Sequence, residues 1–354
     1  MKQLLKILTK KTIKNFLFYT LGLILNKEKK TCTKIAKFLG ITHDRLYGIL
    51  NKTNTLLLLF PSLMLSIAKR FSKEKKGWLI IDYTTMSKPF IKLLAGAYTI
   101  YNTSLGMPDR GFNLVVIAWS NGSVTIPLQF EWYFHKDIVG KDFKTKTEIG
   151  IPLIKCCLGK IPFRYVLFDA HYATINMLKF LCPMRIGFVA KIPRNRKITT
   201  KANQFDRLEN IQQLKLLRNE RSKRIIANYH VMWLYFSHHK RKNKNNIYTD
   251  TFIISNIDIY PKAYYEIYRQ RWNIEEMFRT MKQLLGFADC QSIDLDKQRS
   301  HIFCIFFSYS FLQSEKHKKS LKNPEAAEKL LRELKLNTAM LRITTFSENF
   351  QCFA

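Results

Sequence analysis

Two short apolar runs, each with an aspartate at its end, constrain the fold of this chain most. Residues 78–82 read WLIID and residues 165–169 read YVLFD, and both runs have the length and the β-branched or aromatic content of buried strands. Helix-like and strand-like segments alternate around them, which predicts an α/β core in which neighbouring strands bring Asp82 and Asp169 together. Taken singly, each aspartate also fits a turn, and Asp169 fits the cap of a helix beginning at Ala173.

The segments around these aspartates complete a plausible core. Strands are predicted at residues 112–119, 123–133 and 187–192, with Ser120-Asn121-Gly122 as a hairpin turn, and helices at residues 145–159 and 173–181. An α/β core with carboxylates at two strand ends is typical of the ribonuclease-H type. In that fold the first strand is central and pairs with the strand that carries the second aspartate.

Residues 264–286 form the clearest predicted helix, because they contain no proline and have glycine only at the end. At 100° per residue one apolar stripe appears, made of Ile267, Ile274, Phe278, Met281 and Leu285. The same spacing places Tyr268, Arg271, Glu275 and Lys282 within an arc of about 60° beside it. Such an edge can hold a divalent metal through Glu275 and phosphates through its cations; the alternative is a solvated, charged helix face.

Charge favours a polyanionic partner. The sequence has 59 Lys+Arg against 26 Asp+Glu, a net charge of +33. The most apolar runs, residues 55–68 and 301–313, are shorter than the ~18 to 20 residues that a membrane span needs, and no secretory signal is evident. Seven cysteines without a C-x-x-C pair indicate reduced thiols rather than disulfides or zinc. These features predict a cytoplasmic protein without a membrane segment.

The N-terminal region has the pattern of a helix-turn-helix. Residues 33–51 place Ala36, Gly40 and Leu46 where two crossing helices need a small residue, a turn glycine and a packed aliphatic. The second helix would then present Arg45 and Tyr47 to a DNA major groove. An ordinary helical hairpin has the same pattern and stays open as an alternative.

Three segments together resemble one family. Tyr268-x2-Arg271-x3-Glu275-x6-Lys282 matches the Y-x2-R-x3-E-x6-K signature of a group of bacterial insertion-sequence DDE transposases, the insertion-sequence-four-like group. Residues 79–88, LIIDYTTMSK, resemble the family's D-D-T-x-x-x-K segment, with Tyr83 in place of the second acid. Residues 166–174, VLFDAHYAT, resemble its second-aspartate segment, where His171 departs from the expected small or aromatic residue.

The resemblance implies a catalytic triad and its ions. Asp82, Asp169 and Glu275 would be the catalytic carboxylates and the metal ligands, holding Mg2+ or Mn2+, with two ions expected. Tyr268, Arg271, Lys282 and Lys88 would hold phosphates of the transposon end. Trp272 is a candidate to stack on an unpaired base, although core packing is the favoured interpretation for so large an aromatic residue.

The predicted organisation has five parts. These are a helical N-terminal domain with the helix-turn-helix (1–72), the first part of a ribonuclease-H-like core (73–192), a basic β-rich insertion (193–250), the second part of the core with the signature helix (251–314), and a partly helical tail (315–354). Residues 302–312 form an apolar helix, and Pro324 begins a last helix reaching Leu336. The loop at residues 240–246 is predicted to contact phosphates.

The predicted function is cut-and-paste transposition. The protein would bind the terminal inverted repeats of its insertion sequence, cleave and join DNA strands with metal, and act as a synaptic homodimer on transposon-end and target DNA near the bacterial nucleoid. Two alternatives remain: a transposase-derived DNA-binding protein without cleavage activity, and a stand-alone ribonuclease-H-like nuclease. Neither alternative requires strand transfer.

Overall fold

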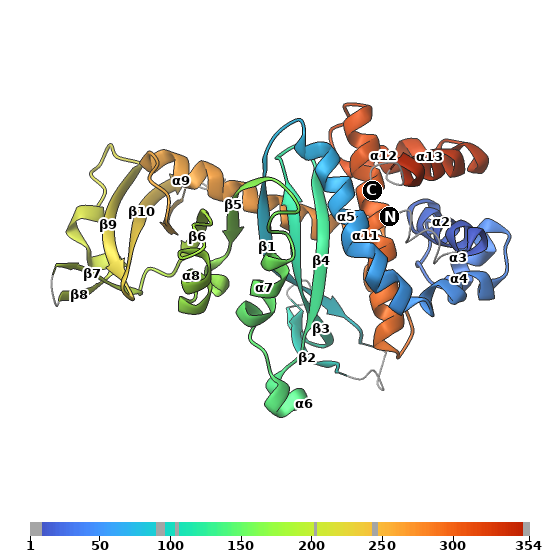
Figure 1. Cartoon of the computed structure of the whole chain (residues 1–354), viewed down its shortest axis with the longest axis horizontal. Helices are drawn as coiled ribbons and strands as arrows, with labels where there is room; N and C mark the ends of the chain where they lie inside the picture. Colours follow the sequence, from blue (N-terminus) through green and yellow to red (C-terminus); the bar gives the residue numbers. More distant parts are fainter. Residues whose placement is uncertain (1–8, 90–95, 103–105, 202–203, 243–246, 350–354) are drawn as a thin grey trace.

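The computed structural model describes residues 9–89, 96–102, 106–201, 204–242 and 247–349. A long mixed sheet forms the middle of the molecule (Figure 1), with helices of the N- and C-terminal regions at one end and a β-rich insertion at the other. The two terminal helical regions, although far apart in sequence, therefore share one end of the fold, whereas the insertion extends away from them.

The core of the sheet has the strand order β4-β3-β1-β5-β6. Its strands are β1 (Gly77–Ser87), β3 (Met107–Ser120), β4 (Thr125–Tyr133), β5 (Phe163–Phe168) and β6 (Phe188–Ile192). The central strand β1 is antiparallel to β3 and parallel to β5, and β5 is parallel to β6. The short strand β2 (Tyr98–Asn102) pairs with the beginning of β3. This order is compatible with the predicted ribonuclease-H-like core.

The insertion continues the sheet beyond β6 in the order β11-β10-β9-β7-β8. Its strands are β7 (Lys197–Lys201), β8 (Gln204–Arg207), β9 (Ser222–Tyr229), β10 (Met232–Lys242) and β11 (Tyr248–Ser255). Short 3-10 turns (Leu208–Asn210 and Gln212–Leu214) connect β8 to β9. Because β11 pairs with both β10 and β6, it ties the insertion to the core.

Helices α5 (Thr53–Ser72) and α11 (Leu295–Lys318) pack on β4 and on each other. Phe60 stacks on Phe303 with ring centroids 4.5 Å apart, and Phe303 contacts Phe130 of β4 at 5.3 Å. By length and composition alone, α5 is apolar enough to cross a membrane. Its buried side chains nevertheless belong to the protein core, and the predicted apolar helix at residues 302–312 is the buried middle of α11.

Two shorter helices complete the core. Helix α7 (Lys146–Lys155) packs against β1, β3 and β4, and α8 (Ile175–Leu181) packs against α7. Helix α6 (Lys136–Val139) and a 3-10 turn (Gly140–Asp142) precede α7. The loop between β3 and β4 is held by the Asn121 side chain, which accepts from the backbone N–H groups of Ser123 and Val124, as expected for the predicted turn.

The N-terminal module consists of α2 (Lys10–Leu25), α3 (Cys32–Leu39) and α4 (His43–Leu50). Gly40 ends α3 with a φ of +63°, a backbone conformation that favours glycine. Ala36 and Leu46 are buried between the helices, so the predicted helical pair is present. DNA contact by this pair stays a prediction.

After α11, the described part of the C-terminal tail contains two helices, α12 (Pro324–Arg332) and α13 (Leu336–Asn349). The prediction of one helix from Pro324 to Leu336 was therefore wrong. The turn after Arg332 allows both helices to bury an apolar side chain: Leu331 of α12 and Phe346 of α13, whose ring contacts Phe307 and Phe311 of α11 while α13 packs on α2. A single straight helix would leave one of these apolar faces in water.

Candidate active site

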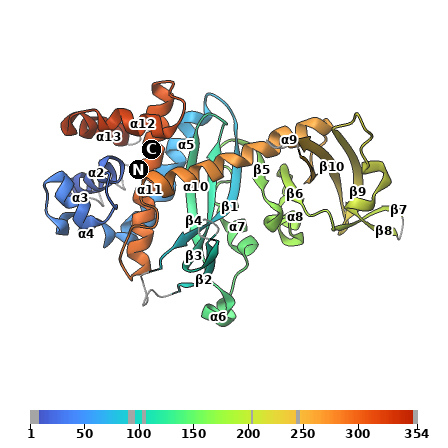
Figure 2. The ribbon, with the colours of Figure 1, turned by 180° about the vertical axis from the view of Figure 1, so that it is seen from behind.

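The signature helix begins three residues before the predicted start and ends two residues before the predicted end, and it is tightened in the middle. It consists of α9 (Pro261–Tyr268), a 3-10 turn (Arg269–Arg271) and α10 (Trp272–Leu284). Figure 2 shows α9 and α10 running along the sheet from the insertion toward the helical end of the molecule. The apolar stripe is buried as predicted, apart from the half-buried Ile267. Proline at the first position favours the earlier start, since its missing N–H is not needed there.

Asp82 lies in the middle of β1 rather than at the end of a strand, so the predicted strand end was wrong. Strand β1 continues to Ser87, because its residues pair with β3 along the whole edge. On the other edge Ile81 pairs with Phe168, the last residue of β5. Asp169 follows Phe168 directly, so the parallel pairing of β1 and β5 brings the two aspartates to adjacent positions.

Asp169 is not a helix cap. Helix α8 is capped by Thr174, whose side chain accepts a bond of 3.3 Å from the backbone N–H of Met177. Asp169 precedes only a 3-10 turn (Ala170–Tyr172) and makes no capping bond with its side chain. Its Oδ1 instead accepts a long bond of 3.4 Å from the Tyr268 hydroxyl.

The polar edge of the signature helix meets both aspartates. Arg271 Nη1 donates to Asp82 Oδ2 at 2.6 Å, and Arg271 Nη2 donates to Glu275 Oε1. With the bond between Tyr268 and Asp169, the helix contacts the carboxylates of two neighbouring strands. Lys282 lies two turns further along α10, exposed and without an ion-pair partner among the residues that the structure describes.

Burial controls the charge of this cluster. It raises the pKa of Asp82 to about 6, although Arg271 and the backbone N–H of Tyr83 favour the ionised form. Burial disfavours the Arg271 cation too, but Tyr268, Asp82 and Glu275 outweigh it and hold the pKa of Arg271 above its usual range. Among the described residues, Arg271 Nε has no hydrogen-bond partner. The guanidinium is thus the cation that neutralises Asp82 and Glu275 in this structure.

The donor chemistry fits a divalent metal ion. Three carboxylates offer the oxygen ligands that Mg2+ and Mn2+ prefer, and Arg271 stands in for a cation between two of them. Within the described ranges, however, no three Asp, Glu, His or Cys side chains are arranged as ligands of one ion. Binding of metal by all three carboxylates therefore requires the Arg271 guanidinium to move.

The affinity for metal is expected to depend on pH through Asp82. A metal ligand must be deprotonated, and burial raises the pKa of Asp82 to about 6. Below that pH protons compete with the ion, so the affinity for Mn2+ should fall by up to about tenfold per pH unit, and above it the affinity should level off. Titration calorimetry between about pH 5 and about pH 8 measures this. An affinity constant over the whole range would exclude Asp82 as a ligand.

Trp272 is not a core residue. Its side chain is 54% exposed, so the favoured interpretation of core packing was wrong. With Tyr265, Arg269 and Asn273 it lines a cavity of about 420 Å³ beside Tyr268. Trp272 begins α10 next to Arg271, where the tightened turn directs it away from the apolar stripe. An exposed indole beside arginines can accept a base by stacking.

The other predicted DNA contacts have partners inside the protein. Lys88 is buried, and its ammonium donates to the carbonyls of Ala288 at 2.7 Å and Cys290 at 2.6 Å. Burial also lowers the pKa of Lys88 to about 8. The prediction that Lys88 contacts DNA does not agree with this position, in which the side chain joins β1 to the segment before α11.

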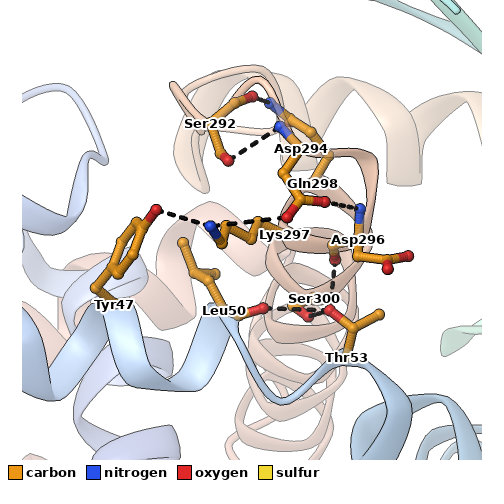
Figure 3. A network of polar contacts seen from close by, with 9 residues as sticks. All are labelled: Tyr47, Leu50, Thr53, Ser292, Asp294, Asp296, Lys297, Gln298 and Ser300. Atoms are coloured by element: carbon orange, nitrogen blue, oxygen red, sulfur yellow. Dashed lines mark hydrogen bonds and ion pairs between the residues drawn. The ribbon is translucent and has the colours of Figure 1, made fainter. Parts of the chain in front are cut away.

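Arg45 and Tyr47 are also engaged. Arg45 donates to Asn15 Oδ1 at 3.2 and 3.1 Å and lies over the Phe18 ring. The Tyr47 hydroxyl bonds Lys297 Nζ at 2.9 Å, at the junction between α4 and the beginning of α11 (Figure 3). In the same junction Thr53 bonds Ser300 at 2.6 Å. The Tyr47 contact joins the N-terminal module to α11, whereas the Arg45 contacts lie within the module. DNA contact by Arg45 or Tyr47 remains a prediction.

Sequence reasoning missed Lys146, which begins α7 close to the carboxylates. Its Nζ lies 3.1 Å from the centroid of the Tyr83 ring; burial lowers the pKa of Lys146 to about 8, although the nearby charge of Asp82 favours the cationic form. The only signal in the sequence was the unusual Tyr83 itself.

Comparison with known families gives two matches. A family model described as a DDE superfamily endonuclease matches residues 3–210, and one described as a transposase DDE domain matches residues 150–311. The first range contains Asp82 and Asp169, and the second contains Asp169 and Glu275. No curated protein matches the chain.

Proposed function

Because the chain belongs to the DDE superfamily of endonucleases, we propose that it is a transposase that cuts the ends of its own insertion sequence and joins them to target DNA. The family makes it a nuclease-type enzyme, generally dependent on divalent metal ions and acting on DNA. The observation that carries the finer proposal is the convergence of Tyr268, Arg271 and Glu275 on Asp82 and Asp169. That helix has the spacing of the insertion-sequence-four-like signature.

Asp82, Asp169 and Glu275 would hold the ions. When bound, two divalent ions activate the attacking hydroxyl and stabilise the leaving oxygen at phosphorus. The protein's own part is to position the DNA. Arg271, released from Asp82 and Glu275, and the exposed Lys282 would bind phosphates of the transposon end. Trp272 would stack on a base next to them.

A basic pocket in the insertion supports binding of the transposon end. Its cavity of about 500 Å³ is lined by five cationic side chains and by no acidic one, namely Arg221, Lys240, Arg241, Lys242 and Lys262. Arg221, Lys240 and Lys242 surround the Tyr248 ring at 5.2 to 5.3 Å from its centroid. Lys262 pairs with Glu266 at 3.5 Å, but Arg221, Lys240 and Lys242 have no ion-pair partner among the described residues, and such cations around an aromatic ring suit a phosphate. Lys240, Arg241 and Lys242 belong to residues 240–246, which were predicted to be a loop that contacts phosphates; these three residues instead form the end of β10, and residues 243–246 lie outside the described ranges.

The protein would act as a homodimer that holds two transposon ends. It would do so in the cytoplasm of a bacterium, at the bacterial DNA. One active site per subunit could then process one end each.

The proposal is tested with linear DNA that carries the inverted repeats flanking the gene, incubated with Mg2+ or Mn2+ and a target plasmid. Cleavage at the ends and joining to the plasmid, both lost in Asp169→Asn, are expected. Cleavage without joining would favour a nuclease. Binding without metal-dependent cleavage would favour a DNA-binding descendant of a transposase.

A further inference from the structure

The two residues that depart from the family pattern contact each other. Tyr83 follows Asp82 and His171 follows Asp169 by two positions, and their ring centroids lie 5.9 Å apart at an interplanar angle of 77°. This edge-to-face arrangement is a favourable geometry for aromatic pairs. The two rings therefore lie together beside the carboxylates, and the His171 side chain is exposed to solvent.

Lys146 contacts the same Tyr83 ring. Its Nζ lies 3.1 Å from the Tyr83 centroid and 5.2 Å from the Tyr133 centroid, so two strands of the core hold the ammonium by their rings. Thr145 caps α7, and α7 packs on the sheet, which fixes where Lys146 begins the helix. Among the described residues Lys146 has no ion-pair partner; burial lowers the pKa of Lys146 to about 8, and the nearby charge of Asp82 offsets part of that effect, so the ammonium predominates at pH 7.

An exposed ring and a cation without an ion pair, both in contact with Tyr83, can together bind an unpaired nucleotide. The ring offers a face on which a base of any sequence can stack, and the ammonium offers a partner for the adjoining phosphate. A paired base in a duplex has no free face for such stacking. The nearness of Asp82 and Asp169 places the nucleotide next to the bond that would be cut.

We propose that His171, Lys146 and Tyr83 bind one unpaired nucleotide of the DNA strand beside the catalytic carboxylates. His171 stacks on the base and Lys146 binds its phosphate. Tyr83 is a positioning residue that contacts the His171 ring in an edge-to-face arrangement and holds Lys146 over its own ring face. The inference rests on the proposed function, because it assumes that DNA ends reach these carboxylates.

The test compares two DNA duplexes of the inverted-repeat sequence, one blunt and one with a short unpaired overhang, with EDTA present so that no cleavage occurs. Fluorescence anisotropy gives the affinity for each. The wild-type protein should prefer the overhang, and His171→Ala should reduce that preference by roughly tenfold. His171→Phe keeps a ring and should keep the preference, as should Tyr83→Phe.

The affinity for the overhang falls as the salt concentration rises. In Lys146→Gln the slope of log affinity against log salt should be shallower by about 0.7, the value for one phosphate contact with a single strand. Lys144→Gln, which removes an exposed lysine from the same segment, is the matched control and should leave the slope unchanged. No wild-type preference for the overhang, or an equal loss in His171→Phe and His171→Ala, would overturn the inference. The affinity for the blunt duplex is measured separately. If either of these results is found while the blunt duplex is still bound, the inference fails but the proposed function does not.

Discussion

Replacing Glu275 with glutamine is expected to slow DNA cleavage by a factor on the order of 10³ while leaving the binding of transposon ends unchanged. The amide has nearly the same shape and can still accept from Arg271, but it lacks the negative charge that a divalent ion needs. Single-turnover cleavage of labelled end DNA measures the rate, and anisotropy without metal measures binding.

The neighbouring carboxylate supplies a matched control for this variant. Glu276 is on the same turn of α10, but it is exposed and forms an ion pair with Arg279 rather than facing the aspartates. Glu276→Gln should therefore cleave at the wild-type rate. If both variants lose activity equally, or if Glu275→Gln retains it, Glu275 is not a member of the catalytic triad.

The part of the site that follows local periodicity could be predicted from the sequence. Helical spacing placed Tyr268, Arg271 and Glu275 on one edge, and this edge faces the aspartates even though a 3-10 turn interrupts the helix. The meeting of Asp82 and Asp169 follows from the alternation of strands and helices, because parallel neighbours place equivalent positions side by side.

Contacts that depend on tertiary packing could not be predicted in this way. Spacing identifies the edge on which Arg271 lies, but it does not show that Arg271 pairs with Asp82 of a distant strand. Lys88 matched a motif, yet its burial is caused by the segment before α11, some two hundred residues later. Lys146 had no local signal, since the rings of Tyr83 and Tyr133 that hold it come from two other strands.

The strand end predicted at Asp82 was wrong for a different reason. The residues after Asp82 are YTTMS, which are polar enough for a turn and also β-prone. These residues form a strand because they pair with β3 as far as Ser87. The length of the strand therefore depends on β3 and not on the local sequence alone. Asp82 consequently lies deeper in the sheet than a residue at a strand end, which explains why burial affects its pKa so strongly.

Replacing Arg271 with glutamine is expected to destabilise the metal-free protein and to strengthen its binding of Mn2+. In the wild-type protein Arg271 is the counter-ion of both Asp82 and Glu275, and the side chains of Arg271 and Asp82 are each only 11% exposed. Removing one partner of a buried ion pair leaves an uncompensated charge, for which the expected cost is about 3 kcal/mol. Thermal or urea unfolding with EDTA present measures this loss.

Mn2+ should then restore the stability that the Arg271→Gln protein has lost, because the ion no longer competes with the guanidinium for the same carboxylates. Mn2+ should raise the unfolding temperature more in Arg271→Gln than in the wild-type protein, since tighter binding to the folded state stabilises it more. Arg279→Gln, which removes an exposed arginine from the same helix, should change neither quantity. Weaker Mn2+ binding in Arg271→Gln would mean that Arg271 organises the carboxylates for the ion rather than occupying its place.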